Sequence, residues 1–212
     1  MNTIGVEPVE VISARMYAVI LTSRRLKQML LPEGLVRSPY EILDYRVALV
    51  MHDPEGMRAT FQRTQVVRFQ QRGVAGVLDH AWGTGVVITT YHNDAGTLAD
   101  SFSDEGRRHM VIALKRAMGP GETLRFSVTR STIACFARDD QWWMDTTIDY
   151  PIRRLSAGIV FPGDRPVRRA VLEHAGRSVT LPLRKLPDGK TLVRFTTSKA
   201  HAHLPYVIRW VW

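Results

Sequence analysis

Three acidic side chains lie next to two tryptophans in the segment from 139 to 145. The run reads Asp139-Asp140-Gln141-Trp142-Trp143-Met144-Asp145. Sugars stack on indole rings and hydrogen-bond to carboxylates, and retaining glycosidases place two carboxyl groups about 5 Å apart. One alternative is therefore a carbohydrate-active enzyme that uses these three aspartates. The other interpretation is a turn at Asp139 and Asp140, followed by a strand whose two indoles face opposite sides. One indole is then free to contact a ligand or partner.

Basic side chains gather between positions 153 and 185. The set consists of Arg153, Arg154, Arg165, Arg168, Arg169, Arg177, Arg184 and Lys185. Most of them flank two predicted hairpins, which makes them the best candidates in the chain for binding an anion or a partner. Nucleic-acid binding is the alternative function, and these residues would then contact the nucleic acid. This alternative predicts an affinity that falls steeply as the salt concentration rises. The competing interpretation is a solvated rim of arginines that protects sheet edges.

Three other places have side chains with chemical potential. Cys135 is the single cysteine, and its apolar neighbours favour a buried, inert thiol over a nucleophile. His201 and His203 have a spacing that two metal ligands can use, but no third ligand is close in the sequence, which favours exposed imidazoles. Asp79 and His80 are adjacent, and adjacent side chains on one strand or helix do not face each other. We therefore assign no catalytic residue, metal or cofactor.

The common motifs of catalysis and cofactor binding do not occur in the sequence. It contains no Gly-x-x-x-x-Gly-Lys-Ser/Thr, no Gly-x-Gly-x-x-Gly, no Gly-x-Ser-x-Gly and no His-Glu-x-x-His. Nucleotide-binding, common hydrolase and zincin interpretations have no motif to support them. The sequence favours a non-enzymatic protein.

Composition indicates a basic globular chain. It has 212 residues, a formal net charge of +9 and a calculated pI of about 10.2. This charge suggests an anionic partner, either a protein or a nucleic acid. The single cysteine excludes an internal disulfide. The best apolar run near the start is the segment 16–21, which is too short to span a bilayer. We expect a cytoplasmic protein that does not enter the membrane.

Two kinds of periodicity divide the chain. Residues 8–31 have apolar side chains at helical spacing, and Ile12, Met16 and Val19 form a face that packs on its own domain, a partner or a second copy. From Tyr40 onward the period is two, except for one expected short helix around 74–82. Turn signals separate the strands. Strands are expected at 45–51, 57–69, 86–91, 98–102, 110–114, 123–132, 141–150, 152–161, 167–173, 179–183, 192–195 and 206–212.

These elements predict an all-β fold, mainly antiparallel. We expect an immunoglobulin-like β-sandwich with an N-terminal helix and one or two short helices. The predicted division is a helical segment at 1–39 and a sandwich domain at 40–212, with a seam near 119–121. The predicted function is an intracellular interaction or ligand-sensing module. It would bind a protein partner, or a second copy of itself, through the basic rim and the Trp142–Trp143 region.

Overall fold

Every regular element in the described part of the protein is a β-strand. The computed structural model describes residues 38–82, 87–104, 107–133 and 143–212, and it contains fourteen strands and no helix within these ranges. The predicted all-β, mainly antiparallel class is confirmed there. The predicted helix at 8–31 lies outside the described residues. No helix in the described ranges has the length and apolarity needed to cross a membrane.

The strands are numbered in chain order. The first seven are β1 (Tyr40–Met51), β2 (Arg58–Phe69), β3 (Val74–Trp82), β4 (Val87–Asn93), β5 (Gly96–Asp104), β6 (Arg107–Met118) and β7 (Thr123–Ile133). The other seven are β8 (Trp143–Thr146), β9 (Leu155–Phe161), β10 (Arg169–His174), β11 (Arg177–Thr180), β12 (Leu183–Lys185), β13 (Thr191–Thr197) and β14 (Tyr206–Val211).

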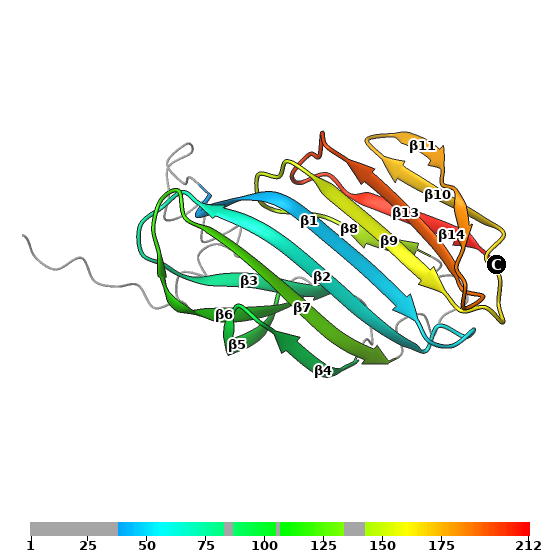
Figure 1. The fold of residues 1–212 in the computed structure, drawn as a ribbon, viewed down its shortest axis with the longest axis horizontal. Coiled ribbons are helices and arrows are strands. Elements are labelled where there is room, and N and C mark those ends of the chain that lie inside the picture. Colours follow the sequence, from blue (N-terminus) through cyan, green and yellow to red (C-terminus); the bar gives the residue numbers. More distant parts are fainter. Residues whose placement is uncertain (1–37, 83–86, 105–106, 134–142) are drawn as a thin grey trace, which may run out of the picture.

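The strands form three sheets (Figure 1). A seven-stranded sheet has the order β12-β13-β9-β1-β2-β7-β4 and runs across the whole view. A three-stranded sheet, β3-β6-β5, lies below it, and a four-stranded sheet, β11-β10-β14-β8, lies at the other end of the molecule. All pairs of the named strands are antiparallel except β1 with β9, where Tyr45 pairs with Leu155 in parallel.

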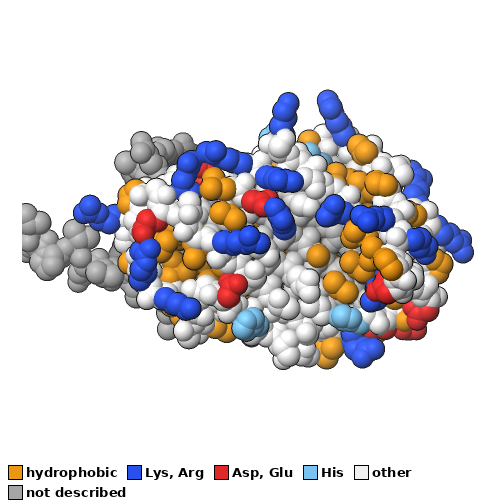
Figure 2. All heavy atoms as spheres, in the orientation of Figure 1, with side chains coloured by type: hydrophobic (Ala, Val, Ile, Leu, Met, Phe, Trp, Pro, Cys, Tyr) orange, Lys and Arg blue, Asp and Glu red, His pale blue; other side chains and the backbone are white. Residues whose placement is uncertain are grey.

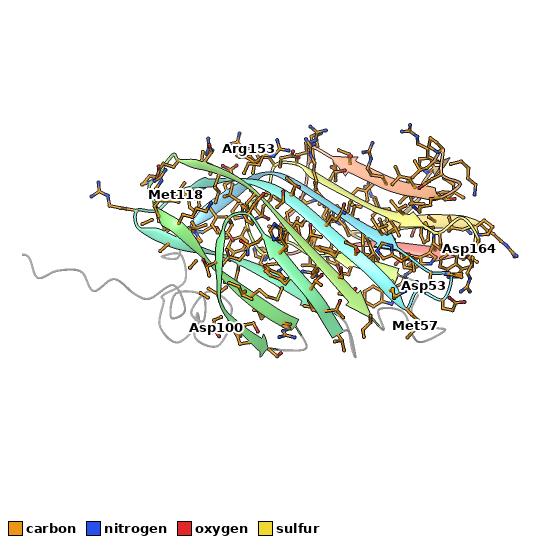
Figure 3. All side chains as sticks on the ribbon, turned by 60° about the horizontal axis from the view of Figure 1, so that its bottom comes forward. Asp53, Met57, Asp100, Met118, Arg153 and Asp164 are labelled. Atoms are coloured by element: carbon orange, nitrogen blue, oxygen red, sulfur yellow. The ribbon has the colours of Figure 1, made fainter. Side chains whose placement is uncertain are left out.

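Alternating side chains build the interior. On β1, Tyr45, Val47, Leu49 and Met51 are buried, because a strand turns every second side chain to the same face. Side chains fill the space between the seven-stranded sheet and its neighbours (Figure 3). The terminal strand β14 inserts Ile208 and Trp210, as predicted, and the Trp210 ring packs edge-on against Phe161 at 5.4 Å. This contact joins the four-stranded sheet to the seven-stranded sheet.

The prediction of a short helix around 74–82 is wrong, because this segment forms β3. Its side chains alternate, with Val77, Asp79 and Ala81 all buried, and it pairs antiparallel with β6. The apolar spacing of three that suggested a helix is too short a run to separate the two periods. The predicted turn at 119–121 is present, with Gly121 at φ 84°, and it links β6 in one sheet to β7 in another.

Candidate partner-binding face

The four-stranded sheet has one face in the interior and one face exposed to solvent. On β14, Tyr206, Ile208 and Trp210 are buried, whereas the alternate residues Arg209 and Val211 are exposed. The outer face is therefore made of every second residue of β14, and the same alternation holds for the start of β10. The sequence predicts that one indole of the Trp142–Trp143 pair is available for contact, and Trp143 lies on this sheet.

Register places an indole between charged and aliphatic neighbours on this face. Trp143 on β8 pairs with Arg209 on β14, and Arg209 pairs with Val171 on β10. Two residues further along β14, Val211 pairs with Arg169. Directly opposed side chains on one face are about 5 Å apart, so these residues form a continuous surface. Trp143 is 40% exposed and Val211 is 57% exposed.

A groove of about 420 Å³ is hollowed in this surface. We call it the Trp143 groove. Its lining consists of Trp143, Arg169, Val171, Glu173, Ser178, Arg209, Trp210 and Val211. Arg209 Nε lies 2.8 Å from Glu173 Oε2, but both side chains are well exposed, and such pairs contribute little to stability. The groove therefore offers an indole ring, aliphatic groups and guanidinium groups to a ligand.

The predicted basic cluster is distributed over several places. Arg153 and Arg154 lie just before β9 and contact Glu41 and Asp44, whereas Arg165 lies beyond the other end of that strand. Arg165 covers the Trp212 ring at 4.5 Å and donates a hydrogen bond to a backbone carbonyl, which gives it a packing role.

The remaining basic residues divide between two sheets. The backbone N–H of Arg168 donates to the Val211 carbonyl, and Arg169 lines the Trp143 groove. Arg177 lies on β11 of the same sheet. Arg184 and Lys185 are exposed on β12, an edge strand of the seven-stranded sheet. Of the predicted basic residues, only Arg169 lines the groove beside the exposed indole.

Some predicted site residues lie outside the described part of the chain. These are Cys135, Asp139, Asp140 and Trp142. Asp145 is on β8, where its carboxylate accepts a hydrogen bond of 2.9 Å from the Thr147 hydroxyl. The carbohydrate-active alternative needs this carboxylate together with Asp139 or Asp140, and it stays a prediction.

The two C-terminal histidines, His201 and His203, are exposed and lie outside the strands, as expected. His201 Nδ1 lies 3.2 Å from Nε2 of His174, and the His174 ring stacks on Tyr206. His203 has a positive φ of 64° in the turn before β14. No group of three or more metal-ligating side chains occurs among the described residues.

Sequence reasoning missed a buried charge cluster between the seven-stranded and three-stranded sheets. Asp79 on β3 is fully buried and lies between two arginines, with Oδ1 at 2.7 Å from Arg63 Nη1 and Oδ2 at 3.1 Å from Arg130 Nη1. Burial alone would raise the pKa of Asp79, but the charges of Arg63 and Arg130 outweigh it and lower the pKa. Burial lowers the pKa of the neighbouring His80 to about 4.

A signal for this cluster is present in the sequence. On β2, Arg63 is an even number of residues from the buried Ala59 and Val67, so it faces the same side of the sheet. On β7, Arg130 faces the same side as the buried Phe126 and Val128 for the same reason. A polar residue at a core-facing position needs a partner inside the protein. The cluster links the seven-stranded sheet to the three-stranded sheet. The Trp143 groove lies on a different sheet, the four-stranded one.

No family model matches the sequence, and no curated protein matches it. Among solved structures, the fold is similar to an M1 zinc metallopeptidase from Deinococcus radiodurans, with a TM-score of 0.50 and 12% identity over 82% of this chain and 43% of that one. It is also similar to a putative protease from Parabacteroides distasonis, with a TM-score of 0.52 and 12% identity over 84% of this chain and 41% of that one. The chain thus spans less than half the length of these proteins, and the likeness is one of fold.

Proposed function

We propose that this chain is a non-enzymatic binding module that docks an acidic segment of a partner protein in the Trp143 groove. The observation that supports the proposal is the position of an exposed indole beside Arg169 and Arg209 in one hollow of the sheet. Tryptophan and arginine are the residues most enriched among those that dominate binding energy at protein interfaces.

The chemistry of the groove favours an acidic partner with one apolar side chain. Arg169 makes no ion pair with any carboxylate in the described ranges, while Arg209 has its pair with Glu173 in open solvent. The whole chain has a net charge of +9, which attracts anionic partners during encounter. Val171 and Val211 provide the apolar contacts that accompany an anchoring side chain.

Several features support a binding role over catalysis. The sequence has no His-Glu-x-x-His, the pattern by which a helix binds zinc in many metalloproteases. A shared fold does not transfer an activity, so we propose no peptidase function from the structural likeness. Of the expected immunoglobulin-like architecture, we retain packed sheets that expose one face for binding. We propose that the module acts in the cytoplasm.

Binding of a defined acidic probe tests the proposal. A fluorescein-labelled peptide of repeating Asp-Glu-Leu is titrated against the protein, and fluorescence anisotropy gives the affinity. Trp143→Ala is expected to weaken binding by about 30-fold, the effect of losing about 2 kcal/mol at an interface anchor. Val87→Ala is the matched control, because Val87 is an exposed apolar residue on β4, away from the four-stranded sheet.

Two outcomes would contradict the proposal. One is an affinity for the peptide that Trp143→Ala leaves unchanged. The other is a concentration-dependent dimer in light scattering that Trp143→Ala abolishes, since that result assigns the groove to a second copy of the chain.

A further inference from the structure

The outer face of the seven-stranded sheet has two rows of mainly polar residues in register. One row crosses β13, β9, β1, β2 and β7, and it consists of Thr196, Ser156, Arg46, Thr64 and Ser127. Neighbouring hydroxyls contact each other, with Thr196 donating to Ser156 at 3.0 Å and Thr64 lying 3.1 Å from Ser127. Neighbouring strands are about 4.8 Å apart, so the row is a regular series of hydrogen-bonding groups.

The next row along the strands contains the smallest residues of this face. It consists of Arg194, Gly158, Ala48, Gln62, Thr129 and His92. A Cβ on Gly158 would lie 2.7 Å from the Val193 carbonyl oxygen, so only glycine fits there. We call the surface formed by these two rows the hydroxyl face. None of its side chains is a phenylalanine, tyrosine or tryptophan.

Arginines gather at one end of this face. Glu41 near the start of β1 is shared by two of them, with Arg68 Nη2 at 2.6 Å and Arg153 Nε at 2.5 Å. The Arg68 and Arg153 side chains are 41% and 58% exposed. Figure 3 shows Arg153 at the edge of the molecule, pointing away from the packed interior.

A second carboxylate is shared in the same way. Asp44 lies 2.8 Å from Arg46 Nη2 and 4.0 Å from Arg154 Nε. Four guanidinium groups therefore share two carboxylates, which leaves an excess of positive charge on the surface. We call Arg46, Arg68, Arg153 and Arg154 the arginine quartet. Figure 2 shows basic side chains over this face with few acidic ones between them.

We propose that the hydroxyl face and the arginine quartet bind the sugar–phosphate backbone of double-stranded nucleic acid. Arginine, serine, threonine and glutamine side chains are the usual donors to backbone phosphates. Binding of single strands relies on aromatic rings on which unpaired bases stack, whereas the two rows contain one such ring, the His92 imidazole at their β4 end.

Salt-dependent binding to a duplex tests this inference. A fluorescein-labelled DNA duplex of random sequence is titrated by anisotropy between 50 and 200 mM salt. Each phosphate contact contributes about −0.9 to the slope of log affinity against log salt. The double variant Arg46→Gln/Arg154→Gln, which changes two exposed arginines, is expected to bind more weakly and to make the slope shallower by about 2.

The matched control removes two arginines from the other exposed sheet. Arg169→Gln/Arg177→Gln changes the same charge on the four-stranded sheet and is expected to leave the slope unchanged. Trp143→Ala is also expected to leave duplex binding unchanged, which separates this inference from the proposed function. Circular dichroism confirms that each variant keeps the β-sheet spectrum.

Four results would overturn the inference. These are no salt-dependent binding to the duplex, an equal loss in the control double variant, tighter binding to a single strand of the same length, and binding of the Asp-Glu-Leu peptide that depends on the arginine quartet. The last result would assign this face to an acidic protein.

Discussion

Asp79 and Glu41 have the same arrangement in two different environments. Each carboxylate lies between two arginine side chains at hydrogen-bonding distance. Asp79 is completely buried between two sheets, and its arginine side chains are 3% and 6% exposed. Glu41 is 14% exposed, and its arginine side chains are open to solvent. The comparison isolates the effect of burial on one kind of charge cluster.

Burial decides what each cluster does. When one member of a buried group is removed, the remaining charges stay in a poorly solvated interior without a partner. This lowers the stability of the folded state strongly. Water stabilises the charges of an exposed group by itself, so the same contacts contribute little to folding but stay accessible to a ligand. The buried cluster therefore stabilises the fold, and the exposed one presents positive charge at the surface.

The largest expected effect comes from Asp79→Asn. The substitution leaves two guanidinium groups buried without a negative partner, and we expect it to lower the free energy of unfolding by about 3–5 kcal/mol. Urea denaturation followed by circular dichroism measures the change. A loss below about 1 kcal/mol would show that the interior solvates the two arginines and would remove the contrast with Glu41.

The two buried arginines are expected to differ. Arg130 also donates to the His80 carbonyl at 2.9 Å and lies 3.8 Å over the Phe61 ring. Arg63 lies farther from its aromatic neighbours, at 5.9 Å from the Tyr45 ring and 5.7 Å from the Phe126 ring, and its Nε and Nη2 have no hydrogen-bond partner. We expect Arg130→Met to cost about 2–3 kcal/mol and Arg63→Met about 1 kcal/mol. The same denaturation experiment ranks them, and the reverse order would contradict this assignment.

The pH dependence of stability is expected to involve His80. Its folded-state pKa of about 4 is below the unfolded value of about 6.5, so the unfolded chain binds more protons between these values. This contribution to stability is present above pH 6.5 and is lost as pH falls toward 4, with a slope below about 1.4 kcal/mol per pH unit. His80→Gln should flatten the curve of unfolding free energy in this window, and an unchanged curve would exclude His80 as its source.

The smallest effect is expected for Glu41→Gln. The hydrogen bond from Arg153 is the main reason that the pKa of Glu41 is lowered, but the cluster is solvated. We expect a loss of at most about 1 kcal/mol, and less at high salt because ions screen exposed charges. The same variant should tighten duplex binding by removing a competing carboxylate. A loss as large as that of Asp79→Asn would break the comparison.

Strand alternation was sufficient to predict much of the fold. The strand expected at 123–132 corresponds to β7, with Phe126 and Val128 facing inward as expected, and the terminal strand inserts its tryptophan. The segment 74–82 was misassigned because a short apolar run fits either period. The buried cluster was missed because its members lie on three strands, and only the packing of two sheets brings them together.

The candidate site shows the same limit. The exposed indole was expected in the segment 139–145, but its neighbours Arg209 and Val171 come from strands that lie far along the chain. Strand pairing across such a distance depends on the whole fold. Local pattern therefore identified the exposed indole but not the groove around it.

The parallel pairing of β1 with β9 can form only late in the synthesis of the chain. Tyr45 leaves the ribosome more than a hundred residues before its partner Leu155. Until then one side of β1, in the middle of the largest sheet, has unpaired backbone groups that can pair with another chain. Contacts so distant in sequence also slow folding. Nascent or truncated chains that end after β7 are thus the form most exposed to aggregation, and their protection during synthesis matters more than that of the finished protein.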